Sequence, residues 1–193
     1  MNRSTNLVII SGPSGAGEDS VIEGLINRNM PITRVITTVT RDMRPGEKEG
    51  KPYYFVSEED FALLIEQNEL AEWAEVYGKK YGVTRRELQR VQGMEQTIGI
   101  WKIEWHGVKT AKQLIPDILA IMISVPNIDE LVERSLKRGR EPEEMITARL
   151  EFTKEWLEHK DLYDYEVINE RGQLENTINQ VIDILRKENF PTT

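Results

Sequence analysis

The chain has 193 residues, of which 39% are hydrophobic and 30% are charged, and its formal net charge is −8. This balance excludes a disordered chain and is typical of a folded domain with a buried core. The acidic charge argues against a coat for nucleic acid or for an anionic membrane surface, but it allows a local basic pocket for a small anion. Without cysteine, and with two histidines far apart in sequence, the chain offers no disulfide, thiolate or zinc-ligand pattern.

A short apolar run, Leu7–Ile10, predicts a buried parallel strand. It leads through Ser11 and Gly12 into a glycine-rich turn, and Ser20–Arg28 then predicts a helix with its apolar residues on one face. Strand, glycine-rich turn and helix form the context in which backbone N–H groups and a helix N-terminus bind phosphate. An ordinary tight turn is the weaker interpretation, because both flanking elements match this context.

In the next part of the chain, residues 32–83, the sequence pattern changes to short β-branched or aromatic runs. The β-branched or aromatic runs Val35–Thr40, Tyr53–Val56 and Glu72–Val76 predict strands, and Glu58–Gln67 predicts a helix. These elements indicate a small mixed β subdomain inserted into an α/β chain.

Beyond this segment, strands and helices alternate, which predicts a parallel sheet covered by helices. The expected strands are 97–103, 118–125 and 165–168. The expected helices are 84–93, 108–114, 130–137, 142–159 and 174–187. We expect a soluble, cytoplasmic protein with no signal peptide and no membrane span.

Two polar clusters are suited to a nucleotide. Arg41 and Arg44 precede a turn and Tyr53 follows it, so that two guanidinium forks and a phenol can hold a phosphate; the alternative is two solvated arginines on a loop. Glu72 lies on an otherwise apolar strand. A carboxylate there accepts both donors of the guanine edge, N1–H and N2–H₂, whereas an exposed strand residue is the alternative.

Six pieces of the sequence follow one another in the order found in guanylate kinases: GPSGAG, TRDMRPGE, G-x-x-Y-x-FVS, EWAEVYGKKYG, HGVK and RGREPEEMITARL. From Gly12 to about Asn169 the chain therefore resembles this family of P-loop nucleoside monophosphate kinases. The resemblance implies an α/β P-loop core with a parallel sheet (1–33, 84–129 and 160–193), a nucleoside-monophosphate subdomain (34–83) and a helical lid (130–159). It also implies transfer of the ATP γ-phosphoryl group to GMP or dGMP with Mg²⁺, in a monomer or homodimer, with no nucleic acid or membrane partner.

The resemblance assigns roles residue by residue. The positions that read guanine are matched by Thr37, Glu72 and Glu104. The positions that hold the monophosphate are matched by Arg41, Arg44, Tyr53 and Tyr81. The lid arginines that close on the transferring phosphoryl group are matched by Arg138 and Arg149. The ATP-binding positions are matched by Gly12, Ser14, Gly15, Ala16, Gly17, Glu18, Asp19, Ser20 and, near the adenine, Asn169.

The phosphate loop departs from the family pattern G-x-x-x-x-G-K-[ST]. Glu18 stands in place of the lysine and Asp19 in place of the small or hydroxyl residue, while Ser20 keeps a hydroxyl one place on. A lysine about 4 Å from one phosphate charge contributes about 4 kcal/mol at an effective dielectric of about 20, and a glutamate there reverses the sign. Uncompensated, the exchange would abolish ordinary ATP binding.

A second departure offers compensation. Lys102 stands where the family usually has an aspartate, on a strand expected beside the phosphate loop. We expect Glu18 and Lys102 to pair, so that Lys102 returns a catalytic cation to the site. Asp19 and Ser20 are the candidate magnesium ligands, with Glu18 as a further carboxylate. The residue after Tyr81-Gly82 is a valine instead of a hydroxyl residue, which is a third departure.

Two other functions remain open. The first is an inactive guanylate-kinase-like domain that binds GMP or a protein partner. The second is another kinase of this fold, since Gly17-x-Asp19-Ser20 also resembles the G-K-D-S loop of ribose-bisphosphate phosphokinases. Glu72 in its EWA context favours guanine, and the joint retention of Glu72, the arginine clamps and the lid arginines favours an altered but working kinase.

Overall fold

A computed structural model describes residues 3–76, 78–137 and 155–192. Its main sheet has five parallel strands in the order β10-β9-β1-β8-β2. The bounds of these strands are β1 (Leu7–Ser11), β2 (Ile32–Arg34), β8 (Ile98–Trp101), β9 (Leu119–Ser124) and β10 (Tyr165–Ile168). The three central strands are buried along their whole length, as the continuous apolar runs predict.

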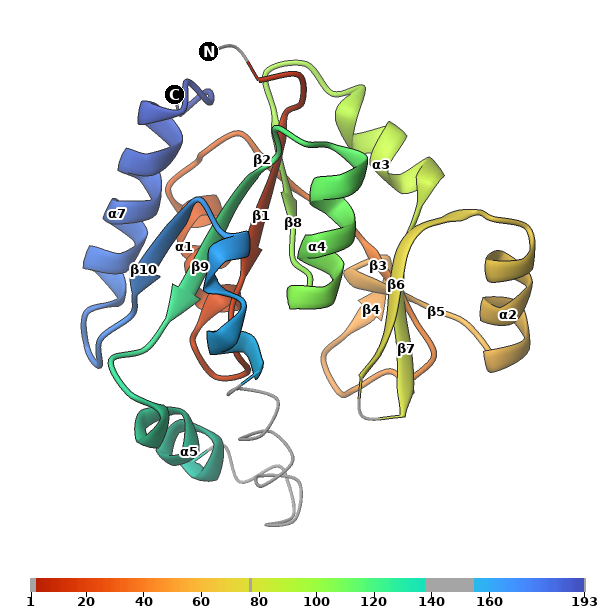
Figure 1. The fold of residues 1–193 in the computed structure, drawn as a ribbon, viewed down its shortest axis with the longest axis horizontal. Coiled ribbons are helices and arrows are strands. Elements are labelled where there is room, and N and C mark those ends of the chain that lie inside the picture. The colour runs from red at the N-terminus through yellow and green to blue at the C-terminus, as the bar shows by residue number, and fades with distance from the viewer. Residues whose placement is uncertain (1–2, 77, 138–154, 193) are drawn as a thin grey trace.

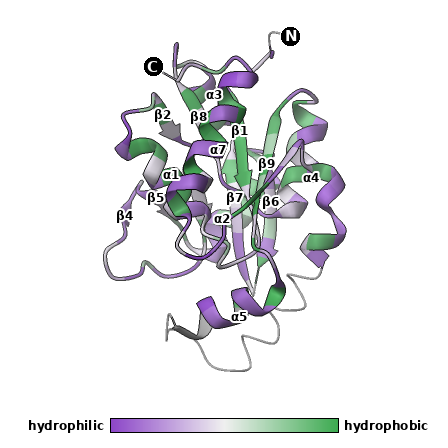
Figure 2. Ribbon diagram, turned by 90° about the vertical axis from the view of Figure 1, so that its left-hand side faces the viewer, coloured by the Kyte–Doolittle hydropathy of each residue, from purple (hydrophilic) through white to green (hydrophobic). Residues whose placement is uncertain are grey.

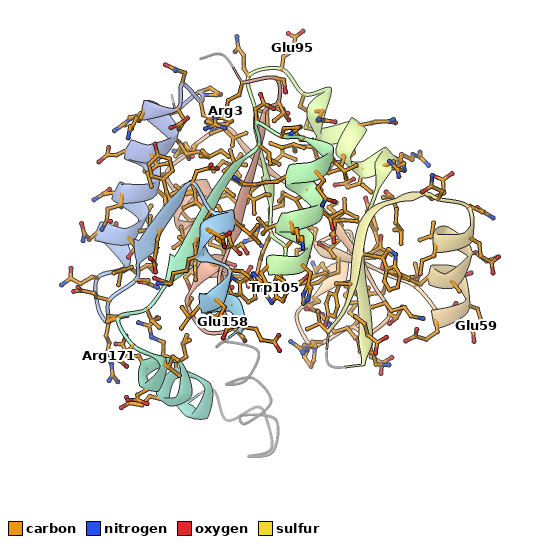
Figure 3. The ribbon with its side chains drawn as sticks, in the orientation of Figure 1. Arg3, Glu59, Glu95, Trp105, Glu158 and Arg171 are labelled. Carbon is orange, nitrogen blue, oxygen red and sulfur yellow. The ribbon has the colours of Figure 1, made fainter. Side chains whose placement is uncertain are left out.

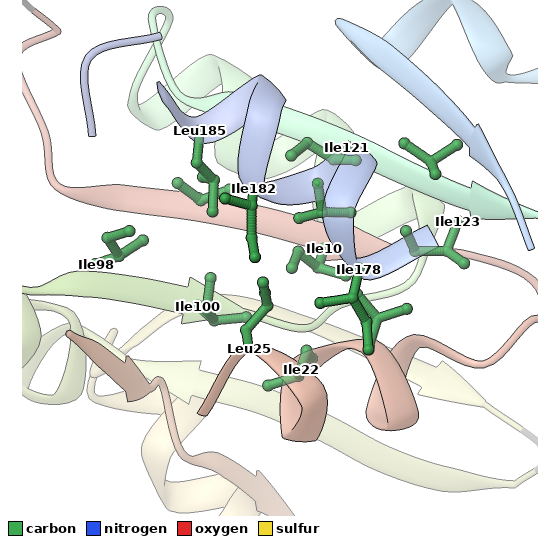
Figure 4. Packing of buried hydrophobic residues seen from close by; sticks show 14 of the residues in the cluster. Ile10, Ile22, Leu25, Ile98, Ile100, Ile121, Ile123, Ile178, Ile182 and Leu185 are labelled. Carbon is green, nitrogen blue, oxygen red and sulfur yellow. The ribbon is translucent and has the colours of Figure 1, made fainter. Parts of the chain in front are cut away.

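Helices cover both faces of this sheet (Figure 1). Side chains of β1 alternate between the two faces, so that Val8 and Ile10 belong to one core cluster and Leu7 and Ile9 to the other. The first cluster packs under α1 (Glu18–Asn27) and α7 (Leu174–Lys187), as Figure 4 shows, and the second under α3 (Arg85–Gln92) and α4 (Trp105–Leu114). Hydrophobic residues accordingly concentrate on the central strands in Figure 2.

A second sheet lies beside the first and is built from residues 37–84 (Figure 1). Its order is β4-β5-β3-β7-β6, and it is mixed, because β3 pairs in parallel with β5 and antiparallel with β7. The bounds of its strands are β3 (Thr37–Val39), β4 (Lys48–Glu49), β5 (Pro52–Phe55), β6 (Leu70–Val76) and β7 (Lys79–Thr84), and α2 (Glu58–Glu66) precedes β6.

Most elements appear close to the ranges that the patterns predict, with two kinds of difference. The run expected as one strand, Val35–Thr40, contains only the short strand β3, because Val35 and Ile36 form the crossing from β2 of the main sheet to the second sheet. At this crossing, the backbone N–H of Ile36 donates to the buried carboxylate of Glu87 at 2.8 Å. Three strands were not predicted: β2 and β4 span only three and two residues, and the Lys79-Lys80 start and Gly82 of β7 hide the alternation.

The remaining described elements are α5 (Ile128–Lys137), helical residues 155–158 and the short helix η1 (Lys160–Leu162). Most of the helix expected at 142–159 lies outside the described residues. The division of the chain into core, subdomain and lid by residue range stays a prediction. Across the described part of the chain, no helix has both the length and the apolar character needed to cross a membrane.

Candidate active site

The loop between β1 and α1 has the backbone of a phosphate cradle. Gly15 and Gly17 have φ values of +100° and +105°, which L side chains rarely adopt. A Cβ at Gly12 would lie 2.1 Å from the carbonyl oxygen of Ile123, so only glycine lets the loop approach β9 this closely.

Asn169, which follows β10, holds the back of this loop. Its Nδ2 donates to the carbonyl oxygen of Ala16 at 2.7 Å, and its Oδ1 accepts from the hydroxyl of Thr177 at 3.1 Å. Arg134 of α5 donates to the carbonyl oxygens of Ala16 and Asn169 at 3.3 and 2.7 Å. Asn169 and Arg134 therefore both fix the loop through the carbonyl oxygen of Ala16.

Asn169→Ala is expected to lower the free energy of unfolding by about 2 kcal/mol, because Ala16 and Thr177 each lose one buried hydrogen bond. Asn179→Ala on the exposed side of α7, which removes a bond to Arg28 at 2.6 Å, is the matched control and should cost well under half as much. Urea unfolding measures both. Equal costs would mean that Asn169 does not fasten the loop.

The carboxyl group of Glu18 turns into the loop. The residue is 8% exposed, and its Oε2 accepts the backbone N–H of Gly17 at 3.0 Å. Burial raises the pKa of Glu18, and the ammonium group of Lys102 opposes this increase. A carboxyl group thus occupies one N–H of the cradle that a phosphate would use.

Lys102 is bonded to Asp19, which differs from the expected pair with Glu18. The distance from its Nζ to Asp19 Oδ2 is 2.5 Å, and Arg34 holds the other oxygen of Asp19 at 3.2 Å. Partial desolvation acts to raise the pKa of Asp19, but the two cations lower it below its usual range. Burial likewise acts to lower the pKa of Lys102, and Glu18 and Asp19 together raise it. Lys102 therefore faces two carboxylates, of which Asp19 is the bonded one.

A cavity of 260 Å³ opens between the loop, the second sheet and the end of β8. Its wall contains seven of the residues predicted for the acceptor and for catalysis: Thr37, Arg44, Tyr53, Glu72, Tyr81, Lys102 and Glu104. The loop contributes Gly12, Ser14 and Glu18. Trp156, from helical residues 155–158, also lines the cavity. It was not predicted as a site residue, and the one feature that sets it apart in the sequence is its aromatic ring within a charged predicted helix.

Glu72 forms the buried acidic end of this cavity. The side chain is on β6, and the residue is 6% exposed. Burial first, and the charge of Glu104 second, raise the pKa of Glu72 to about 8. A Cβ at Gly107 would lie 3.0 Å from Glu72 Oε2, so a glycine at the start of α4 leaves room for the carboxyl group.

Glu104 has a structural task beside Glu72. Its two carboxylate oxygens cap α4, accepting the backbone N–H groups of His106 and Gly107, each at 2.9 Å. Trp105, labelled in Figure 3, follows directly and marks this end of the helix.

Arg41 lies next to the cavity with its charge already paired. Its guanidinium group donates to both oxygens of Glu47, at 2.6 and 2.7 Å, and lies 4.7 Å from the ring centroid of Tyr53. Bonding to Glu47 keeps the pKa of Arg41 above its usual value. Glu47 was not predicted as a site residue, although it belongs to the RPGE motif that carries Arg44.

On the other side of the loop lies a second cavity of 360 Å³. Its wall contains four residues predicted for ATP, namely Gly15, Gly17, Ser20 and Asn169. It also contains Glu130, Glu133 and Arg134 of α5, Glu170, Arg171 and Gly172 of the turn before α7, and Leu174 at the start of α7. The predicted lid residues Arg138 and Arg149 lie outside the described residues.

The candidate magnesium ligands form a sparse donor set. Asp19 and Ser20 are both exposed, and the described residues hold no group of three or more His, Cys, Asp or Glu that could hold a metal ion. One carboxylate and one hydroxyl fit Mg²⁺, which keeps several waters and takes its other oxygens from phosphates.

Residues 4–188 match the family model for guanylate kinase. The chain belongs to the guanylate kinase family. It is 37% identical over 180 residues to the guanylate kinase of Trichodesmium erythraeum, covering 93% of this chain and 95% of that protein. It is 33% identical over 195 residues to that of Shewanella violacea, covering 100% and 92% of the two chains. The crystal structure of guanylate kinase from Anaplasma phagocytophilum superimposes with a TM-score of 0.74 and 29% identity, covering 97% of this chain and 88% of that one.

Proposed function

We propose that this guanylate kinase family member transfers the γ-phosphoryl group of ATP to GMP or dGMP. The observation that carries the proposal is the acceptor cavity, which has a buried carboxyl group, Glu72, among the predicted phosphate ligands Arg44, Tyr53 and Tyr81. The carboxylate of Glu72 can accept from the two donors of the guanine edge, and Arg44, Tyr53 and Tyr81 can donate to a phosphate. The relatives named guanylate kinase support the same acceptor.

In this proposal the chain positions two nucleotides on either side of the phosphate loop. Thr37, Glu72 and Glu104 read guanine, and ATP occupies the second cavity with its phosphates against the loop. Asp19 and Ser20 would hold Mg²⁺, and the bound ion would neutralise developing phosphate charge. Lys102 is the catalytic cation that the loop itself lacks, since this residue directly follows β8 and lines the acceptor cavity.

The first test is ligand-induced stabilisation. GMP at a hundred times its dissociation constant should stabilise the protein by about 2.7 kcal/mol and raise its melting temperature. AMP and CMP at the same concentration should do much less, because their base edges do not present two donors to Glu72. Equal stabilisation by GMP and AMP would contradict the assignment of Glu72 to guanine. A coupled assay with GMP, ATP and Mg²⁺ then decides on turnover.

The second candidate function is a binding module without turnover. The observation that favours it is Glu18, whose carboxyl group takes the Gly17 N–H in place of a phosphate. Such a module would bind GMP and give no product in the coupled assay, so the two experiments together separate the candidates.

Arg41→Ala and Arg44→Ala are each expected to weaken GMP by about tenfold to a hundredfold, because each removes a charged partner of the phosphate. Guanosine, which has no phosphate, should bind either variant as it binds the wild type. Glu47→Gln, which removes charge from the Arg41 pair without removing a cation, is the matched control and should not weaken GMP. Calorimetric titrations with both ligands check this. Equal weakening of GMP and guanosine would contradict the phosphate role.

A further inference from the structure

Three polar side chains, those of Trp156, Tyr163 and Ser11, form a line of hydrogen bonds that begins at the wall of the acceptor cavity. Trp156 Nε1 donates to the phenol oxygen of Tyr163 at 2.9 Å, and this oxygen lies 3.0 Å from Ser11 Oγ. Ser11 Oγ in turn donates to the carbonyl oxygen of Ile103 at 2.7 Å. The line runs from helical residues 155–158 to the segment between β8 and α4.

The donors and acceptors fix the direction of every bond in this line. An indole nitrogen only donates, and a backbone carbonyl only accepts. The single proton of Ser11 is used on Ile103, so the bond between the two hydroxyls must be donated by Tyr163. Burial raises the pKa of Tyr163, which keeps that proton in place. Bonds aligned in one direction polarise one another, so a change at one end is felt at the other.

Both ends of the line touch the proposed machinery. Trp156 is 4% exposed and lines the acceptor cavity. Ile103 lies between Lys102 and Glu104, and its carbonyl belongs to the same peptide group as the N–H of Glu104. Ser11 is 0% exposed and directly precedes the phosphate loop.

We propose that Trp156, Tyr163 and Ser11 are positioning residues that form a one-directional relay from the 155–158 segment to the Lys102–Glu104 segment. The relay holds Lys102 and Glu104 at the acceptor cavity in a geometry that depends on the position of the Trp156 side chain. This inference rests on the proposed function for its catalytic consequence, but the relay itself is open to a test without nucleotide.

The test without nucleotide is an NMR spectrum of the full chain. Ser11→Ala should shift the indole N–H resonance of Trp156, which is two hydrogen bonds away and is assigned by its loss in Trp156→Phe. In the other direction, Trp156→Phe should shift the backbone amide of Glu104, and this shift should vanish when Tyr163→Phe is already present. A shift of the same size in both backgrounds would be a direct effect of the ring through space and would overturn the relay.

The matched control is Tyr165→Phe, which removes a phenol that donates to Glu188 at 2.6 Å on another part of the molecule. It should move neither resonance. Both tyrosine variants keep the aromatic ring, so we expect both to fold. The remaining resonances of the same spectrum check this.

The consequence is measured with GMP. Tyr163→Phe should raise the dissociation constant for GMP by about threefold to tenfold, which corresponds to one neutral hydrogen bond, and Tyr165→Phe should not. Unchanged GMP affinity in Tyr163→Phe would overturn the positioning role even if the resonances move. If the wild type binds no GMP, the proposed function fails, and the spectra alone decide whether the relay exists.

Discussion

Glu72→Gln is expected to weaken GMP by roughly a thousandfold, because one of the two hydrogen bonds to guanine is lost and the other is no longer assisted by a negative charge. Glutamine keeps the size of the side chain, but it replaces one acceptor by an NH₂ donor that faces another donor. Glu75→Gln, on the same strand with an exposed side chain, is the matched control and should bind GMP normally. A variant that retained GMP affinity would remove Glu72 from the guanine site.

The same substitution should stabilise the empty protein at alkaline pH. The pKa of Glu72 rises from 4.5 to about 8 on folding, so between these values the folded state keeps a proton that the unfolded state has lost. The wild type therefore loses stability as pH rises through this window, by up to about 1.4 kcal/mol per pH unit. Glutamine does not titrate, so the stability of Glu72→Gln relative to the wild type should increase from pH 4.5 to pH 8 and then level off.

Binding of guanine should expel the proton from Glu72. The ionised form accepts from both guanine donors, whereas the protonated form has an O–H directed at one of them. At pH 7 we expect nearly one proton to be released per guanosine bound, and the affinity for guanosine to rise with pH up to about 8. Titration calorimetry in buffers of different ionisation enthalpy counts the protons. Guanosine is used because it lacks the titrating phosphate of GMP, and an absence of release would mean that Glu72 is ionised before binding.

Much of the architecture is encoded in local patterns. The apolar runs of β1 and β9 and the apolar stripe of α7 predict buried strands and a covering helix, because burial of a continuous face decides their structure. The glycine-rich loop is predictable for a similar reason, since its backbone conformation demands glycine at fixed positions. The motifs also identify most of the residues that line the acceptor cavity.

Side-chain choices between near neighbours are not encoded in this way. Both Glu18 and Asp19 are acidic and adjacent, and sequence alone favours pairing the family's reversed positions, Glu18 and Lys102. In the structure Glu18 turns inward to the Gly17 N–H, while Asp19 faces Lys102 and Arg34. This outcome depends on the start of α1 at Glu18 and on the neighbouring edge strand β2, which no local pattern specifies. The pairing of Arg41 with Glu47 depends on a turn in the same manner.

Lys102→Ala is expected to lower the rate of phosphoryl transfer by about a thousandfold. The site would then hold Glu18 and Asp19 against a polyanion, and the lost attraction is about 4 kcal/mol for a charge at about 4 Å with an effective dielectric of about 20. Lys112→Ala removes a similar ion pair, with Asp164 at 3.0 Å, and serves as the matched control with unchanged transfer. If Lys102→Ala transfers phosphate as well as the wild type, Lys102 does not replace the loop lysine.

Combining Glu18→Lys with Lys102→Asp separates an altered kinase from an inert binding module. The pair restores the arrangement usual in the family, so the double variant should keep or exceed wild-type transfer although Lys102→Asp alone is inactive. Since both residues act on the same buried charge balance, we expect a coupling of about 0.5–3 kcal/mol in the double-mutant cycle. Asp19 is the bonded partner of Lys102, so Asp19→Asn should free the ammonium group and should also weaken the binding of Mg²⁺. Because it changes two things at once, this variant cannot replace the Glu18 variant in the cycle. A wild type without turnover, together with an active double variant, would mean that Glu18 converts a kinase site into a binding site and that Lys102 only neutralises it.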